Sequence, residues 1–139
     1  MPELCRIGVA INDDLLKEFD RLIEKRGYAN RSEAFRDMIR NELVQDIWQS
    51  PRTEVFGTVT LVYDHHARLL TERLTELQHK YHSSIISTLH VHLDHDNCLE
   101  VILVRGTAAR VQQLSNALIA TKGVKHGRFT GTTSGARLP

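Results

Sequence analysis

Residues 89–101 constrain the fold of this chain more strongly than any other stretch. They form two apolar segments with alternating side chains, joined by a short polar turn, and this pattern predicts a β-hairpin. If His92 pairs with Cys98, His90 lies opposite Glu100 on the same face, because side chains alternate along a strand. The other face then collects the apolar side chains: Leu89, Val91, Leu93, Leu99 and Val101. We expect that apolar face to belong to the core.

The polar face of the hairpin has the composition of a metal site. Two imidazoles and a thiolate in one cross-strand neighbourhood can share a transition metal ion. The fourth donor must come from elsewhere, and His79, near the end of a predicted helix, is the best candidate, followed by His82. We expect this helix to lie behind the opposite sheet face, so that His79 comes from another subunit. These donors suit Zn²⁺ in a tetrahedral site and Ni²⁺ or Cu²⁺ in a square-planar one, and the residue types leave the choice open.

Each of these residues also has an ordinary structural interpretation. His90 and His92 could be polar positions on a half-exposed strand, and Cys98 could be a small buried side chain. Glu100 could orient an imidazole from behind the ligands, or it could be an exposed carboxylate. The concentration of histidines in residues 79–95 favours metal binding by the set. Three loop histidines are interpreted as surface residues with weak metal affinity at most: His65, His66 and His95.

The amino-terminal part of the chain predicts a small dimeric unit. Residues 4–11 alternate in polarity and predict a short strand without a hairpin partner nearby. An unpaired strand leaves its backbone groups unsatisfied, so we expect it to pair with the same strand of a second copy. Two helices follow, the first capped at Asn12 or Asp13 and the second beginning at Asn30 and ending before Pro51. So short a segment has too little core to fold alone, which again implies a dimer.

This order of one strand and two helices in residues 1–50 resembles the ribbon-helix-helix family of DNA-binding proteins. A two-stranded ribbon of that kind enters the major groove, and a helix start suits a phosphate. The resemblance implies three groove-facing and three phosphate-facing positions: Arg6, Gly8 and Ala10 in the ribbon, and Asn30, Arg31 and Ser32 at the helix start. Gly8 and Ala10 depart from the family, which usually carries hydrogen-bonding side chains there. We therefore expect base readout to depend on Arg6 and on DNA shape.

The rest of the chain predicts a second domain at residues 51–131 and a flexible tail at residues 132–139. The order strand, helix, strand, strand, helix, strand is that of a ferredoxin-like domain, and it resembles small-molecule-sensing ACT domains. The predicted fold class is α+β, with a βαα domain followed by a βαββαβ domain. We expect both helices of the second domain to cover the sheet face of Leu89 and Val91. The face of His90 would then lie open to a second copy.

Charge, hydropathy and cysteine content limit the kinds of protein that this chain can be. A net charge of +1 provides no general attraction for nucleic acid, so DNA binding must depend on local charge. No run approaches the roughly 20 apolar residues of a bilayer span, and the amino terminus lacks a secretion signal. We therefore expect a cytoplasmic protein without membrane contact. With Cys5 and Cys98 as the only cysteines, we expect no disulfide framework and a free Cys98 thiol.

Together, the two domains resemble the NikR family of nickel-responsive repressors over nearly the whole chain. The resemblance rests on the hairpin, on Gln78 and His79 upstream of it, and on residues 123–127 downstream. It implies one square-planar Ni²⁺ site per chain, in a homotetramer that is a dimer of dimers. The ligands would come from two subunits: His90, His92 and Cys98 of one and His79 of another. The family also implies a second cation, often K⁺, held by Glu33 and Asp37.

The sequence therefore predicts a nickel-dependent repressor that binds a palindromic operator of nickel uptake or related metal genes. Two alternatives from other classes stay open. The chain could be a metal storage or chaperone protein, or an antitoxin-type DNA-binding module with a small-molecule-sensing domain. We expect neither enzymatic activity nor a small-molecule substrate, because no nucleophile, base and orienting group converge, and four protein ligands leave no open metal position.

Overall fold

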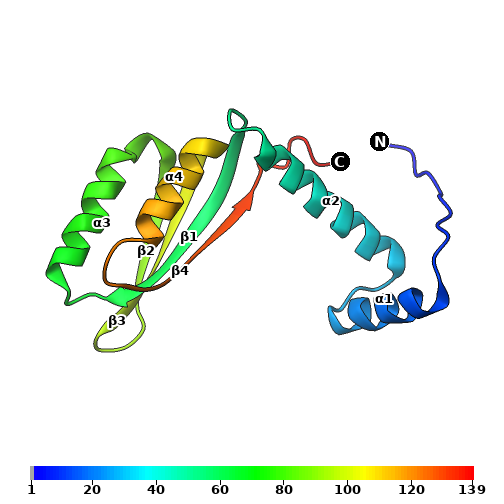
Figure 1. Ribbon diagram of the computed structural model, residues 1–139, viewed down its shortest axis with the longest axis horizontal. Coiled ribbons are helices and arrows are strands. Elements are labelled where there is room, and N and C mark those ends of the chain that lie inside the picture. The colour runs from blue at the N-terminus through cyan, green and yellow to red at the C-terminus, as the bar shows by residue number, and fades with distance from the viewer. Residues whose placement is uncertain (1) are drawn as a thin grey trace. The chain divides into compact units, whose positions relative to one another are not determined.

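A computed structural model describes residues 2–139 of the chain. Contacts divide the chain into two compact units, the first ending at Asn41 and the second spanning Glu42–Pro139 (Figure 1). The division falls inside helix α2 (Arg31–Gln49). The domain limits expected from the sequence, at residues 1–50, 51–131 and 132–139, remain predictions. No helix of the described residues is both long and apolar enough to cross a membrane.

The first unit contains helix α1 (Asp13–Lys25) and the first part of α2. An asparagine side chain caps each helix start. The Oδ1 atoms of Asn12 and Asn30 accept a hydrogen bond from the backbone N–H three residues further on, at 2.8 and 2.9 Å. Gly27 follows α1 with a φ of 81°, a left-handed conformation that ends a helix with little strain in glycine. The predicted helices and their caps are confirmed.

The segment before α1, residues 2–12, contains no strand in the structure of a single chain. Its apolar side chains are open to solvent, with Leu4 91% and Ile7 79% exposed. The strand predicted for residues 4–11 needs its backbone partners from a second copy. The ribbon therefore remains a prediction, which this exposed apolar surface supports.

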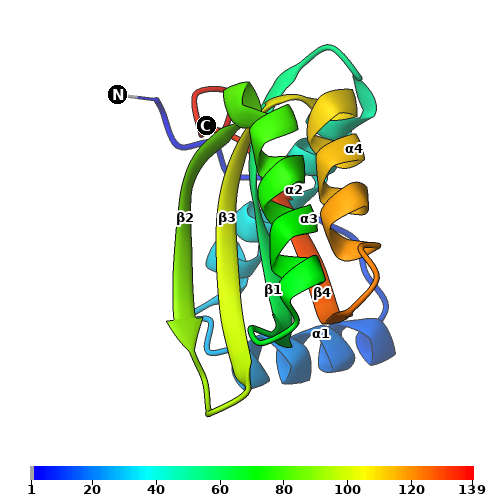
Figure 2. The ribbon, with the colours of Figure 1, turned by 90° about the vertical axis from the view of Figure 1, so that its left-hand side faces the viewer.

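The second unit is a four-stranded antiparallel sheet with two helices on one face. Its main elements follow in the order β1 (Glu54–Asp64), α3 (Arg68–Lys80), β2 (Ile85–His92), β3 (Asn97–Thr107), α4 (Ala108–Ile119) and β4 (Val124–Thr132). A 3₁₀ turn, His82–Ser84, joins α3 to β2. The strands lie side by side in the order β2-β3-β1-β4, which makes β2 and β4 the edges (Figure 2). The predicted α+β class and the ferredoxin-like, ACT-type arrangement are confirmed.

The two helices cover the sheet face opposite to the expected one (Figure 2). The side chains buried under α3 and α4 come from alternate positions of the central strands: Val55, Val59, Leu61 and Tyr63 of β1, and Cys98, Glu100, Ile102 and Val104 of β3. Leu89 and Val91 lie on the other face and are 59% and 41% exposed. The prediction that the helices cover the face of Leu89, Val91, Leu99 and Val101 and leave the face of His90, His92, Cys98 and Glu100 open is therefore wrong.

The physical reason lies in the two central strands. Strand β3 is apolar on both faces, since Leu99, Val101 and Leu103 alternate with Cys98, Ile102 and Val104. The hairpin alone therefore does not determine which face is covered. Strand β1 determines it, because Val59 and Leu61 on one face alternate with Thr58 and Thr60 on the other. Covering the more apolar face of β1 removes more apolar surface from water.

Candidate metal centre

The polar face of the hairpin forms with the predicted register. Strand β2 pairs with β3 so that His92 lies opposite Cys98 and His90 lies opposite Glu100. All four residues lie on the helix-covered face. Cys98 and Glu100 are buried on the central strand β3, whereas His90 and His92 lie on the edge strand β2, which the helices leave open (Figure 2). The rings of His90 and His92 are exposed, and their centroids lie 5.7 Å apart. Two imidazoles accessible from solvent thus lie beside a buried thiol.

The Cys98 thiol is the buried member of this group. Its side chain is fully buried, and its Sγ lies 3.5 Å from the backbone oxygen of Tyr63. Burial raises the pKa of the thiol above its ordinary value, hydrogen bonding with Tyr63 opposes the rise, and the charge of Glu100 adds to it. The thiol is therefore protonated at neutral pH when no metal is bound. A bound metal cation supplies the positive charge that favours the thiolate.

Glu100 is a buried carboxyl group with both oxygens in hydrogen bonds. Its side chain is 6% exposed; one oxygen accepts from the Tyr63 hydroxyl and the other from the Gln78 amide at 2.9 Å. These bonds join β3 to β1 and α3, and they offset the cost of burying the carboxyl group. Burial and the contact with Glu100 raise the pKa of Tyr63, so its hydroxyl stays a donor. The Tyr63 ring lies 6.0 Å from the ring of His90, and direct orientation of an imidazole by Glu100 remains a prediction.

Replacing Tyr63 with phenylalanine is expected to lower the free energy of unfolding by about 1–3 kcal/mol, because the buried Glu100 carboxyl loses one of its two donors. Urea denaturation of the metal-free protein measures this change. Tyr81→Phe is the matched control, since Tyr81 packs against the same core and its hydroxyl makes no hydrogen bond to a described residue. Equal losses of stability in the two variants would contradict the role of the Tyr63 hydroxyl.

His79 lies in the last turn of α3 with an exposed side chain. Its neighbour Gln78 faces the sheet, and consecutive helical residues point about 100° apart, so His79 faces elsewhere. Helix α3 lies on the same side of the sheet as the hairpin ligands, contrary to the prediction that it lies behind the opposite face (Figure 2). Within the described part of one chain, the four predicted donors do not converge to within 4.8 Å of one another. A second subunit as the source of His79 remains a prediction.

Three contacts at this centre were not predictable from the sequence pattern. The ring of His65, in the connection between β1 and α3, stacks on His92 with a centroid separation of 4.5 Å and an interplanar angle of 4°. Tyr63 and Gln78 meet at Glu100 from β1 and α3. Tyr63 is identified as a neighbour of the site by its position opposite Cys98 in the pairing of β1 with β3. That pairing joins segments that are distant in the sequence.

The predicted DNA-contacting residues of the first unit are all exposed: Arg6, Gly8, Ala10, Asn30, Arg31 and Ser32. The Asn30 side chain is engaged as a helix cap. Arg31 forms a bidentate ion pair with Asp20, with N···O distances of 2.9 and 2.8 Å. This hydrogen-bonded pair lowers the pKa of Asp20 and raises that of Arg31. The amides that open α2 suit a phosphate oxygen, and the DNA contacts themselves remain predictions.

The residues predicted to hold a second cation are each paired with an arginine. Glu33 pairs with Arg36, and Asp37 pairs with Arg40 at 3.3 Å. The Tyr28 hydroxyl also hydrogen bonds to Asp37, and this bond is the main cause that raises the pKa of Tyr28. A cation at Glu33 and Asp37 would compete with two guanidinium groups, so this site also remains a prediction.

Comparison with known proteins finds matches along both units. Residues 56–132 match the family described as the NikR C terminal nickel binding domain, and residues 6–46 match the ribbon-helix-helix protein, copG family. Proteins of Solibacter usitatus and Geobacter metallireducens, provisionally named nickel-responsive regulators, are 66% and 55% identical over 138 residues, which is 99% of this chain and of each relative. An uncharacterized protein of Thermotoga maritima shares the fold over 56% of this chain and 96% of its own, with a TM-score of 0.50 and 15% identity.

Proposed function

Because this chain belongs to the NikR family of nickel-responsive transcription regulators, we propose that it is a repressor whose affinity for a palindromic operator rises when Ni²⁺ binds. The family is one of DNA-binding regulators, and the chain is not an enzyme. The operator would belong to nickel uptake or related metal genes, and the protein would act in the cytoplasm, where the chromosome lies. The observation that carries the proposal is the pairing of His92 with Cys98 inside the matched nickel-binding domain.

The donors at the hairpin fit nickel chemically. Imidazole and thiolate groups are ligands that Ni²⁺ accepts in square-planar sites. We assign one ion per chain to a site shared by two subunits, with these ligands: His90, His92 and Cys98 of one and His79 of the other. The buried Glu100 supports this assignment, because its partner Gln78 precedes His79 and its partner Tyr63 lies beside His90. The hydrogen bonds of Glu100 thus connect β3, which carries Cys98, to α3, which carries His79.

Two separate surfaces of the second unit support assembly into a homotetramer. On the uncovered sheet face, Leu89, Val91 and Leu103 are 59%, 41% and 38% exposed, and contact with a second copy would remove them from water. The hairpin ligands lie on the other, helix-covered face, so the subunit that donates His79 must use a different contact. Two different self-complementary contacts per chain close into a dimer of dimers.

Nickel would act by shifting the population of tetramer arrangements. An ion held between subunits favours the tetramer arrangements in which its ligands can meet. It strengthens DNA binding only if those arrangements also place two ribbons on one palindrome. Arg6 would then contact a base edge. In that arrangement Glu33 and Asp37 would exchange their arginine partners for a second cation such as K⁺.

Genomic capture tests the proposed function. Fragmented DNA of the host is bound to the purified full chain, with and without one Ni²⁺ per chain, and the bound fragments are sequenced. Enrichment of one palindromic sequence only in the presence of nickel is the expected result. Equal enrichment in both samples would overturn nickel control. An absence of enrichment in both would overturn operator binding and favour metal storage.

A further inference from the structure

Two loops of the second unit meet next to the end of the hairpin. One is the connection between β1 and α3, and the other is the turn between β2 and β3. The backbone N–H of His65 donates to the carbonyl oxygen of Asp96 at 3.0 Å, and the Nε2 of His65 lies 2.8 Å from the carbonyl oxygen of His95. These contacts hold the two loops against each other.

Each loop is also braced by a carboxylate of its own. Asp64 accepts a hydrogen bond from the backbone N–H of His66 at 2.8 Å. Asp94 accepts from the backbone N–H groups of Asp96 and Asn97 at 2.9 and 2.8 Å, and these bonds lower the pKa of Asp94. The conformations of both loops are therefore held before any ion binds.

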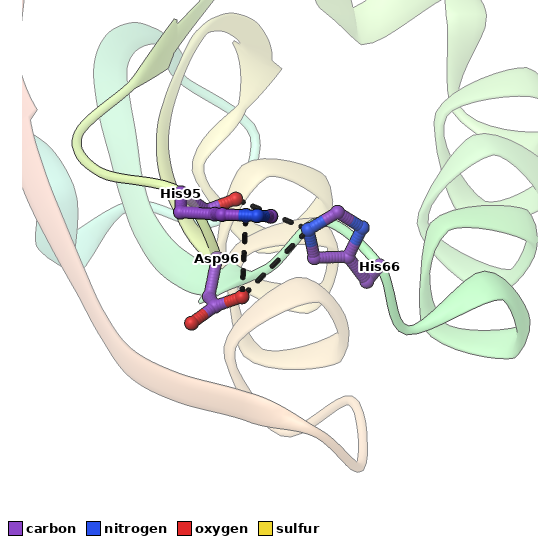
Figure 3. Close-up of side chains that lie close together, drawn as sticks. All are labelled: His66, His95 and Asp96. Carbon is purple, nitrogen blue, oxygen red and sulfur yellow. Dashed lines mark hydrogen bonds and ion pairs between the residues drawn. The ribbon is translucent and has the colours of Figure 1, made fainter.

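Three side chains project from these loops and converge (Figure 3). The Nε2 of His66 lies 3.7 Å and the Nδ1 of His95 lies 3.6 Å from the same oxygen, Oδ1 of Asp96. Bonds of about 2.0–2.2 Å to a tetrahedral ion place its ligands roughly 3.3–3.6 Å apart, so these spacings are within about 0.1 Å of those of ligands around one ion. Within residues 2–139, no other group of three or more His, Cys, Asp or Glu donors comes within 4.8 Å.

We propose that His66, His95 and Asp96 form a second metal site, at the surface, for a divalent transition metal ion such as Zn²⁺, Ni²⁺ or Co²⁺. Two imidazoles and a carboxylate are ligands that these ions accept. All three side chains are exposed, and three protein ligands leave coordination positions to water. The site therefore binds more weakly and exchanges faster than a buried site with four protein ligands.

Binding requires one local rearrangement. The Nε2 of His66 lies 3.1 Å from the carbonyl oxygen of His95, and it must give up this contact and carry no proton in order to bind an ion. The carbonyl oxygen keeps its contact with His65. The polar groups of the loop therefore stay satisfied when the site is occupied.

The second site shares no ligand with the proposed nickel centre, although the two are neighbours. His65 connects them, because its ring stacks on His92 while its Nε2 contacts the carbonyl oxygen of His95. Substitutions can therefore separate the two sites. The sequence allowed His66 and His95 weak metal affinity at most, and the proposed site gives them this role together with Asp96.

The test uses variants of the full chain and Zn²⁺ as the probe. Cys98→Ala removes the thiolate of the proposed nickel centre, and His66→Ala is then added to remove the second site. Zn²⁺ is titrated into each protein by calorimetry at neutral pH, and the ring nitrogen shifts of the histidines are followed by NMR. His126→Ala, added to Cys98→Ala, is the matched control, since His126 is an exposed histidine on β4.

The Cys98→Ala protein is expected to bind Zn²⁺ with shifts at the rings of His66 and His95. Adding His66→Ala should remove the zinc-induced shift at the His95 ring, and adding His126→Ala should leave it. Zinc-induced shifts confined to His90 and His92, or a binding event unchanged by His66→Ala, would overturn the second site. A different result would contradict the proposed function, namely Ni²⁺ binding that Cys98→Ala leaves unchanged. The experiment therefore distinguishes failure of the second site from failure of the proposed function.

Discussion

Operator binding that no longer responds to nickel is the expected result of replacing Cys98 with alanine. The substitution removes the only sulfur donor of the hairpin and leaves imidazoles alone to hold the ion. The chain should still fold, because the loss of one small buried group costs on the order of 1 kcal/mol. The effect on nickel control is therefore expected to be complete while the loss of stability is small.

The measurement is fluorescence anisotropy with the DNA fragment that genomic capture enriches, at increasing Ni²⁺. The ratio of Kd without nickel to Kd with nickel should fall to about one for Cys98→Ala. An ion that binds every tetramer arrangement with the same affinity shifts no population among them. Cys5→Ala is the matched control for the nickel response, because Cys5 is the other free cysteine and lies outside the second unit. A Cys98→Ala protein with the nickel response of the wild type would refute the assignment of the thiolate.

Loss of the Arg6 guanidinium is expected to weaken operator binding by about 1–3 kcal/mol, which is roughly 5- to 150-fold in Kd. Arg6 is the only one of the three predicted groove-facing positions with hydrogen-bond donors in its side chain, since Gly8 and Ala10 have none. The nickel response of the Arg6→Ala protein should be retained, because the metal centre lies in the second unit.

The same anisotropy assay, repeated with a scrambled fragment, tests this prediction. Arg21→Ala is the matched control, since Arg21 lies exposed on α1 and pairs with Glu18 at 2.8 Å. A loss confined to the operator would place Arg6 on a base edge. Similar losses on both fragments would place it on a phosphate instead. Unchanged operator affinity would contradict the groove-facing position altogether.

Local interactions made much of this fold predictable from the sequence. The helix caps depend on residues three positions apart. Asn30 caps α2 as predicted, and Asn12, one of the two residues predicted for the first cap, caps α1. The pairing of His92 with Cys98 depends on a short turn and on alternating side chains, and it also forms. The order of strands and helices follows from the same short-range patterns. The hairpin pattern also predicted metal ligands at His90, His92 and Cys98, whereas the choice of nickel and the DNA contacts came from family resemblance.

Long-range packing settled what these local patterns left open. The sheet face covered by the helices depends on β1, because β3 is apolar on both sides and only its distant partner strand distinguishes them. The hydrogen bonds of Glu100 come from two separate elements, β1 and α3. His66 meets His95 and Asp96 across loops that α3 and β2 separate in the chain. Periodicity shows which side chains share a face of one element. The packing of the whole unit determines which other elements contact that face.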